Sequence, residues 1–348
     1  MRVLVTGGAG FIGSHAVRRL LDEGCDVLNI DKLTYAGSLD NLEGHRNHPK
    51  HRFEQVDICD INKIRALFAD FQPQAVLHMA AESHVDRSID GPQVFIQTNI
   101  VGTHTVVKAA HDFWQGLPEV EKGAFRFVHL STDEVFGALR EEGFFTEQTP
   151  YQPNSPYAAS KASSDLLVRS YSKTYKFPAI IINASNNYGT HQYPEKLIPL
   201  MILSALEEKP LPVYGEGKQV RDWLFVEDHI NGLWAALTKG KPGESYCIGG
   251  GYEIRNLDLV HKLCAILDEK QPRAGGKPYA ELITFVKDLP GHDFRYATDT
   301  AKIKRDLGWT PKTKFDDGFA KTIAWYLAGQ ERLLKIPARV RQGKVGAA

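Results

Sequence analysis

The sequence predicts an α/β protein with a doubly wound parallel sheet and a smaller, interleaved C-terminal lobe. Apolar runs of strand length alternate with longer amphipathic segments, and a glycine-rich turn follows the first of these runs. The expected strands are residues 2–6, 26–30, 52–56, 74–79, 125–130 and 177–183. Strands that alternate with helix-length segments are typical of right-handed βαβ units, which build a parallel sheet.

The alternation holds to about residue 185 and then changes. Beyond that point the sequence is richer in proline, glycine and short elements, which favours a second, smaller lobe closing over the sheet. We therefore expect a sheet domain over residues 1–185, an interleaved lobe over 186–330 and a tail over 331–348. The tail has no acidic residue after Glu331, and we expect it to be frayed and solvated.

The composition excludes several classes of protein. The 348 residues include 42 basic and 42 acidic ones, so no overall charge favours a nucleic acid or an anionic membrane as partner. No eighteen apolar residues run together, and no signal-like segment opens the chain. The cysteines lie far apart, which argues against a metal site or a disulfide framework: they are Cys25, Cys59, Cys247 and Cys264. We expect a cytoplasmic protein.

The glycine-rich turn predicts a dinucleotide site. Gly8, Gly10 and Gly13 form a G-x-G-x-x-G pattern, preceded by Gly7, between the first expected strand and a helix. Such glycines allow a tight turn, close approach of a pyrophosphate, and close packing of helix on strand. The phosphates would then bind the free amides of the helix N-terminus. Asp31 ends the second strand, where an acid bonds ribose hydroxyls and repels a 2′-phosphate, so NAD is favoured over NADP.

Two further polar residues follow expected strands. Asp57 ends the third strand, and Ser83 comes shortly after the fourth. Open parallel sheets bind ligands at the carboxyl ends of their strands. Each of these residues alone is compatible with an ordinary turn or helix cap, but together, in register, they indicate a Rossmann-type NAD-binding domain.

Tyr157 and Lys161 are candidates for chemistry. They lie four residues apart in an expected helix that starts at Pro156, so they share one face. An ammonium beside a phenol stabilises the phenolate and lowers the pKa of the tyrosine, which makes a base for an alcohol proton. On an arbitrary helix, a tyrosine and a lysine at this spacing are more simply explained as two side chains on the surface of an amphipathic helix.

The stretch "STDEVFG" places two acids, Asp133 and Glu134, at the end of the fifth expected strand. Taken alone it is most simply a turn, because Ser, Thr and Asp bond their own backbone and Gly137 accepts a positive φ. Adjacent carboxyls whose environments separate their pKa values can also supply one acid and one base.

Several strings carry a family resemblance. "TGGAGFIGSH", Tyr157-x-x-x-Lys161 and the pair Ser131 and Thr132 resemble the extended short-chain dehydrogenase/reductase superfamily. Within it, the chain closely resembles the dTDP-glucose 4,6-dehydratase family from residue 1 to about 328. The strings that carry this closer resemblance come from both lobes: "STDEVFG", "NSPYAASKASSDLLVRSY", "SNNYGTHQYPEKLIPLMI", "LPVYGEGKQVRDWLFVEDH" and "PGHDFRYATD".

The resemblance implies a reaction in three steps on a nucleotide sugar. C4 is oxidised by NAD, water is eliminated across C5 and C6, and C6 is reduced, giving dTDP-4-keto-6-deoxyglucose for deoxysugar synthesis. It implies that Asp133 is the acid that protonates the C6 hydroxyl, Glu134 the base at C5, and Thr132 a donor to the C4 oxygen. Tyr157 and Lys161 complete the implied catalytic set.

The resemblance also implies two sets of binding residues. The cofactor set is Gly7, Gly10, Phe11, Ile12, Gly13, Asp31, Lys32, Thr34, Asp57, Ile58, Ala80, Ala81, Ser83, Thr98, Tyr157, Lys161 and Asn187. The substrate set is Ser83, Thr132, Asn186, Lys196, Leu197, Pro212, Tyr214, Arg221, Asn256 and His292. In this set Arg221 is a candidate for bidentate phosphate contact. Leu289 stands where the family commonly has arginine, which removes one phosphate partner.

Three alternatives remain open at this point. A UDP-glucose 4,6-dehydratase differs only in the nucleotide base of its substrate. Thymine and uracil differ by one methyl group, which changes the binding free energy by only about 1–3 kcal/mol. A nucleotide-sugar 4-epimerase shares the cofactor and the Tyr/Lys pair but needs no acid pair. A non-catalytic NAD-binding sensor or scaffold needs neither the Tyr/Lys pair nor the acid pair.

The sequence also predicts an oligomer. Residues 92–114 and 155–176 are expected as long helices with apolar residues on more than one side. Val101, Thr105 and Lys108 of the first and Ala158, Ala162 and Leu166 of the second leave a surface that packing on the sheet does not fully explain. The superfamily resemblance implies that two such helices pair with their symmetry mates in a four-helix bundle. We therefore expect a homodimer.

Overall fold

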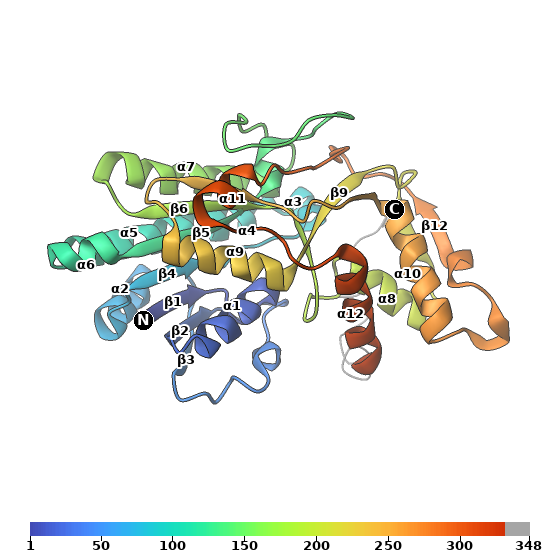
Figure 1. The fold of residues 1–348 in the computed structure, drawn as a ribbon, viewed down its shortest axis with the longest axis horizontal. Coiled ribbons are helices and arrows are strands. Elements are labelled where there is room, and N and C mark those ends of the chain that lie inside the picture. Colours follow the sequence, from blue (N-terminus) through green and yellow to red (C-terminus); the bar gives the residue numbers. More distant parts are fainter. Residues whose placement is uncertain (331–348) are drawn as a thin grey trace.

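A parallel seven-stranded sheet forms the centre of the protein in the computed structural model, which describes residues 1–330 (Figure 1). Its strands are β1 (Arg2–Thr6), β2 (Asp26–Asp31), β3 (His51–Gln55), β4 (Ala75–His78), β5 (Arg126–Thr132), β6 (Ala179–Ala184) and β10 (Ser245–Ile248). They lie in the order β10-β6-β5-β4-β1-β2-β3. The six predicted strands and the doubly wound fold are confirmed. The predicted tail, 331–348, lies outside the described residues.

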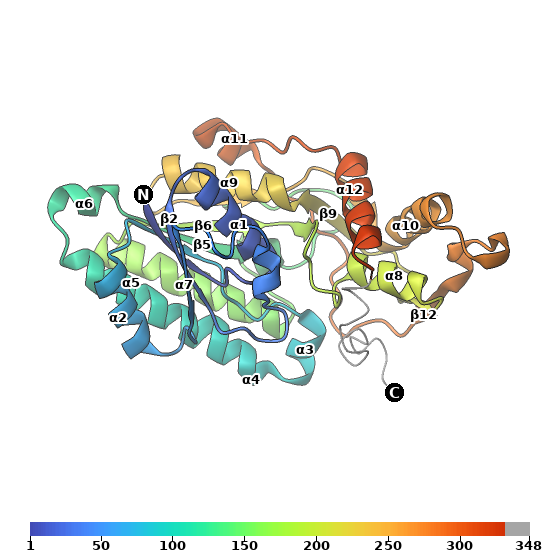
Figure 2. The same ribbon diagram turned by 90° about the horizontal axis from the view of Figure 1, so that it is seen from below.

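Two layers of helices cover the sheet (Figure 2). One face carries α1 (Phe11–Asp22), α9 (Val226–Lys239) and α11 (Ala301–Leu307), and the other carries α2 (Ile61–Phe71), α5 (Thr103–Gln115) and α7 (Pro156–Tyr175). Successive strand residues alternate between the layers: Val3 and Val5 join the core under α1 and α9, whereas Leu4 joins the core under α2, α5 and α7. Both faces of the central strands are buried, which explains their continuous apolar runs, whereas the edge strand β3 is only partly buried.

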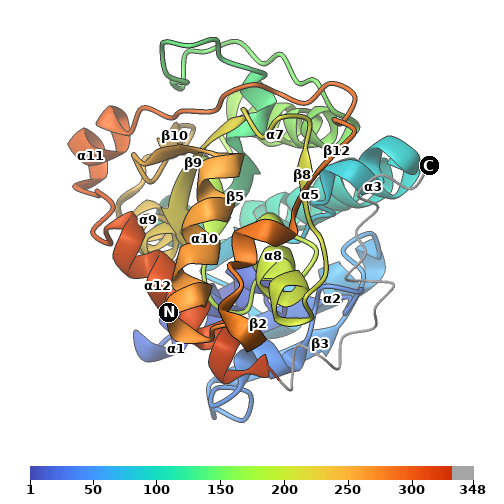
Figure 3. The same cartoon turned by 90° about the vertical axis from the view of Figure 1, so that its right-hand side faces the viewer.

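The smaller lobe, which faces the viewer in Figure 3, has its own core. Its sheet contains β7 (Asn186–Tyr188), β9 (Val220–Phe225) and β11 (Glu253–Arg255), and a parallel pair is formed by β8 (Leu211–Tyr214) and β12 (Ile283–Val286). Three helices pack around this core: α8 (Leu197–Leu206), α10 (Asn256–Lys270) and α12 (Phe315–Ala328).

The chain passes between the two lobes more than once. After β7 and β9 have contributed to the smaller lobe, α9 returns to the main sheet and β10 pairs with β6 in parallel. The domain boundary at residue 185 stays a prediction, because it is placed where the sequence pattern changes. No helix within residues 1–330 is long and apolar enough to cross a lipid bilayer.

The predicted helix over 92–114 is interrupted. It consists of α4 (Pro92–Phe95), a π-helical segment (Ile96–Gly102) and α5, and it follows the short helix α3 (Val85–Asp90); α6 (Glu119–Ala124) comes after it. A Cβ at Gly102 would lie 2.6 Å from Ile58 Cδ1, so the segment packs closely on the loop after β3. This widened turn carries Thr98 into the cleft described below.

Candidate active site

Two adjoining cavities form one cleft at the carboxyl ends of the central strands. The first has a volume of about 380 Å³ and lies over β1, β2, β4 and β5. The second, of about 230 Å³, lies between this sheet end and the smaller lobe. Four residues line both cavities: Glu134, Asn186, Glu195 and Lys196. Glu134 therefore stands at the junction.

Every residue predicted for the cofactor lines the first cavity. These are Gly7, Gly10, Phe11, Ile12, Gly13, Asp31, Lys32, Thr34, Asp57, Ile58, Ala80, Ala81, Ser83, Thr98, Tyr157, Lys161 and Asn187. The structure thus brings the whole set together, and the binding role of each stays a prediction.

The glycine loop has no room for a side chain at Gly7 or at Gly13. Gly7 has a φ of 75°, and a Cβ there would lie 2.8 Å from Ala80 Cα. A Cβ at Gly13 would lie 2.0 Å from Gly7 O, so α1 can start this close to the turn only with glycine at that position. The backbone cradle therefore fits a dinucleotide pyrophosphate at the N-terminus of α1.

Asp31 is held at the end of β2 by backbone amides. Its carboxylate accepts hydrogen bonds from Ala9 N at 3.0 Å and from Leu33 N at 2.8 Å. Burial nevertheless raises the pKa of Asp31. Beside it, Lys32 Nζ pairs with Asp57 Oδ2 at 2.7 Å.

The predicted substrate residues lie mainly around the second cavity. Those that line it are Asn186, Lys196, Leu197, Pro212, Tyr214, Arg221, Asn256 and His292, while Ser83 and Thr132 line the first cavity. Leu289 also lines the second cavity, so an aliphatic side chain contributes to its wall.

Arg221 is fixed by the residues around it. Its guanidinium donates to Val220 O at 2.8 Å and to Asp293 O at 3.0 Å, and it lies 4.2 Å from the Tyr296 ring centroid. Arg221 is buried. A cation held in this way is pre-organised for an anionic ligand in the second cavity.

Asp133 and Glu134 begin a 3-10 turn (Asp133–Phe136) directly after β5. Thr132 Oγ1 caps this turn by accepting from Glu134 N at 3.3 Å, and Gly137 ends it with a φ of 88°. The turn expected from the sequence is confirmed, and the same turn places both carboxyls in the wall of the cleft.

The two carboxyls have different environments. The pKa of Asp133 is raised well above its ordinary value by burial and by the neighbouring Glu134 and Asp222. Burial raises the pKa of Glu134 to about 7, while Lys196 and Arg221 act against this rise. At neutral pH the Glu134 carboxyl is therefore close to half ionised, next to an Asp133 carboxyl whose pKa is also raised.

The expectation that Lys161 lowers the pKa of Tyr157 is wrong for the protein alone. Burial and the Glu134 carboxylate raise the pKa of Tyr157 well above 10, with only a hydrogen bond to Thr132 lowering it. Lys161 Nζ instead donates to Leu130 O at 2.8 Å, and burial lowers the pKa of Lys161 to about 8. Helical spacing predicted the shared face correctly but carries no information on burial.

Sequence reasoning missed two buried residues of the cleft. Glu195 accepts from Tyr35 OH at 3.0 Å, and its Oε2 lies 3.3 Å from Arg87 Nη2. His229, on α9, lies 2.7 Å from Asn187 Oδ1 through its Nδ1. Nothing in "YPEKL" or "VEDHING" distinguishes these residues from ordinary loop and helix positions; only the fold brings them to the cleft.

Comparison with known proteins identifies the family. The family model described as GDP-mannose 4,6 dehydratase matches residues 4–322. A dTDP-glucose 4,6-dehydratase of Neisseria gonorrhoeae is 55% identical over 334 residues, which cover 95% of this chain and 96% of the relative.

Solved structures give a consistent result. A dTDP-glucose 4,6-dehydratase from Streptomyces venezuelae with NAD bound has a TM-score of 0.88 and 43% identity, covering 97% of this chain and 100% of that one. A UDP-glucose 4-epimerase from Thermotoga maritima with UDP-glucose has a TM-score of 0.83 at 25% identity, covering 95% and 100%. The epimerase therefore shares the fold, whereas the dehydratases also share about half of the sequence over nearly its full length, and this chain belongs to the dTDP-glucose 4,6-dehydratase family.

Proposed function

We propose that this protein is a lyase that converts dTDP-glucose to dTDP-4-keto-6-deoxyglucose with NAD as cofactor. The observation that carries the proposal is the pair of adjacent carboxyls, Asp133 and Glu134, in the wall of the cleft, where burial raises the pKa of both and Lys196 acts against the rise at Glu134. Elimination of water needs one such acid and one such base.

The first cavity is the NAD site in this proposal. The glycine cradle at Gly7 and Gly13 fits the pyrophosphate, and Asp31, at the end of β2, faces the ribose. When bound, NAD supplies the acceptor for the C4 hydride, the donor that returns it to C6, and a positive nicotinamide ring that favours a phenolate nearby. Asn187, fixed by His229, is among the residues that hold it.

Tyr157 takes the proton of the C4 hydroxyl, and Thr132 donates a hydrogen bond to the C4 oxygen. Lys161 contributes its positive charge from the same face of α7. Once C4 is a ketone, the proton at C5 is acidic. Glu134 removes this proton, and Asp133, whose pKa burial raises, gives its proton to the C6 hydroxyl, which departs as water. When the hydride returns to C6, Glu134 gives its proton back to C5.

The second cavity takes the nucleoside diphosphate. The pre-organised guanidinium of Arg221 neutralises phosphate charge, and Lys196, whose Nζ donates to Ser83 O at 2.6 Å, adds a second cation. The apolar part of the wall, which includes Leu197, Pro212 and Leu289, faces the remaining nucleotide.

The test is incubation with dTDP-glucose and, separately, with UDP-glucose, followed by the alkali-induced absorbance of a 4-keto sugar. We expect the keto product from dTDP-glucose with no net NADH, because the hydride is returned within each turnover. A C4 epimer without keto sugar, or NADH formed in step with product, would contradict the proposal. A faster reaction with UDP-glucose would show that the preferred substrate carries uracil instead of thymine.

We further propose a homodimer in the cytoplasm. The support is apolar surface on the segment before α5 and on α7: Ile96, Val101 and Leu166 are 44%, 40% and 56% exposed. The structure corrects part of the basis for this prediction, since Thr105, Ala158 and Ala162 are buried within one protomer and add nothing to the surface. Location in a reducing compartment fits the four free cysteines.

A further inference from the structure

Asp165 is a buried carboxylate behind the proposed catalytic residues. It lies on α7, four residues after Lys161 and eight after Tyr157, so the three side chains project from one face of the helix. Only 1% of the residue is exposed. A buried charge is costly unless it is hydrogen-bonded and compensated by a charge of opposite sign.

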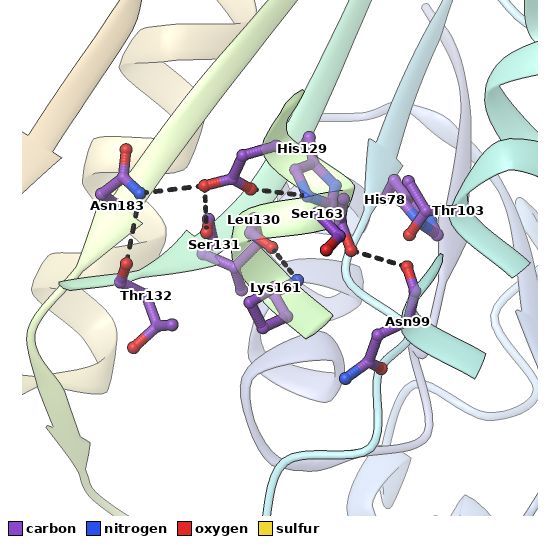
Figure 4. Close-up of polar contacts among 12 residues, drawn as sticks. His78, Asn99, Thr103, His129, Leu130, Ser131, Thr132, Lys161, Ser163 and Asn183 are labelled. Atoms are coloured by element: carbon purple, nitrogen blue, oxygen red, sulfur yellow. Dashed lines mark hydrogen bonds and ion pairs between the residues drawn. The ribbon is translucent and has the colours of Figure 1, made fainter. Parts of the chain in front are cut away.

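The hydrogen-bond partners of Asp165 are neutral. Its Oδ2 accepts from Ser131 Oγ at 2.7 Å, from Tyr151 OH at 2.9 Å and from Asn183 Nδ2 at 3.2 Å. Asn183 also donates to Thr132 O at 3.2 Å, a contact drawn in Figure 4. Three donors orient the carboxylate, but none of them brings a positive charge.

His129, which lies beside Asp165, does not carry a positive charge either. His129 Nε2 lies 3.1 Å from Asp165 Oδ1, but burial and the nearby Lys161 lower the pKa of His129. Its ring stacks on His78 at a centroid distance of 5.3 Å, and burial holds the pKa of His78 well below 6.5. The His78 nitrogens lie 2.8 Å from Thr6 Oγ1 and 3.0 Å from Thr103 Oγ1. Both rings are therefore neutral at physiological pH.

Lys161 is the cation that remains. Its Nζ is buried, and the hydrogen bond to Leu130 O, visible in Figure 4, is to a neutral carbonyl. Burial lowers the pKa of Lys161 to about 8, and Asp165 is the charge that acts against this fall. The ammonium and the carboxylate thus share one buried environment, one helical turn apart.

We propose that Asp165 is a positioning residue that acts through Lys161: its oriented carboxylate is the counter-charge that keeps Lys161 an ammonium beside Tyr157. This inference rests on the proposed function only for the role of Lys161 in the reaction. The charge coupling between Asp165 and Lys161 is independent of it.

Other ionisable groups surround this pair, and they are the same in the variants described below. Those that act directly on Lys161 or Asp165 are His78 on β4, His129 on β5, Tyr151 before α7 and Tyr157 on α7, and Tyr157 is in turn affected by Asp133 and Glu134 on the 3-10 turn. Comparison at matched pH therefore isolates the effect of Asp165.

The test is the titration of Lys161 by NMR of lysine labelled with ¹³C at Cε, with Lys161→Arg to assign the signal. In Asp165→Asn, which keeps the shape of the side chain, we expect Lys161 to titrate at least about one pH unit lower than in the unmodified protein. Tyr151→Phe is the matched control, because it removes one hydrogen bond from the same carboxylate oxygen and leaves the charge. An unchanged titration in Asp165→Asn, or an equal shift in both variants, would overturn the proposal.

The pH dependence of turnover gives a second readout. The fall in kcat at alkaline pH should move to lower pH in Asp165→Asn and much less in Tyr151→Phe. If the unmodified protein does not turn over dTDP-glucose, the proposed function fails, while the NMR titration still tests the coupling.

A stability cycle covers the case in which Asp165→Asn does not fold alone. Lys161→Met leaves the buried carboxylate without its counter-charge, so the double variant with Asp165→Asn should be more stable to urea than Lys161→Met itself. A double variant no more stable than Lys161→Met would show that the two charges are not coupled and would overturn the proposal.

Discussion

Glu134 is the residue with the most direct chemical test. In Glu134→Gln the side chain keeps its size but cannot act as the proposed base at C5, whereas Tyr157 and Lys161, the residues proposed for oxidation at C4, are unchanged. In a single-turnover mixture we expect NADH without dehydrated product and an overall rate lower by about 10²–10⁴. Glu141→Gln, on an exposed loop, is the control. An unchanged rate in Glu134→Gln would remove this residue from the mechanism.

The raised pKa of Glu134 also has a consequence for stability. The folded-state pKa is about 7 against an ordinary value of 4.5, so ionisation disfavours the folded state above pH 4.5, and this penalty is complete above pH 7. We expect Glu134→Gln to be more stable than the unmodified protein at pH 8 by about 1–3 kcal/mol, and equally stable at pH 4. Urea unfolding at the two pH values measures the difference.

The sequence predicted which side chains meet at the cleft better than it predicted their charge states. Spacing on α7 and the strand-end positions of Asp31 and Asp133 are properties of local sequence, and the structure brings these residues together. The pKa of Tyr157 depends instead on burial and on Glu134, which comes from another element. The contacts of Glu195 join loops far apart in the chain, so no local pattern could indicate them.

At the scale of elements, the turn from β1 into α1 has little room for added side-chain atoms. In Gly13→Ala the new Cβ would lie 2.0 Å from a backbone oxygen, so the turn must open and the cradle must lose its shape. We expect binding of NAD, measured by calorimetry, to weaken at least about tenfold. Gly123→Ala, on α6, is the matched control because no atom lies within 4 Å of the added Cβ. Equal binding by both variants would show that the cradle is not the NAD site.

The elements differ in how far local sequence determines them. Strands buried on both faces have continuous apolar runs, and their predicted bounds agree with the structure to within one or two residues. The π-helical segment Ile96–Gly102 could not be predicted, because the close approach of Gly102 to Ile58 is a tertiary contact.

For the whole molecule, the main prediction is a dimer. Light scattering at micromolar concentration should give a mass near twice the chain mass of 38.9 kDa. Leu166→Glu places a charge on the exposed face of α7 and should shift the mass towards that of one chain. Phe285→Glu is the control, since Phe285 is 58% exposed on β12, in the other lobe. A monomer for the unmodified protein, or an equal effect of both substitutions, would count against this face as the interface.

The late return of the chain to the main sheet constrains how the protein can fold during synthesis. Until residues 226–248 have been made, β6 has no partner on its outer side, and Leu130, Ile180 and Ile182 lack the cover of α9. The first 185 residues thus contain every residue predicted for the NAD site except Asn187, but not a complete core. We expect a fragment of residues 1–185 to aggregate rather than bind NAD, and a ribosome-bound chain to become resistant to protease only after β10 has emerged.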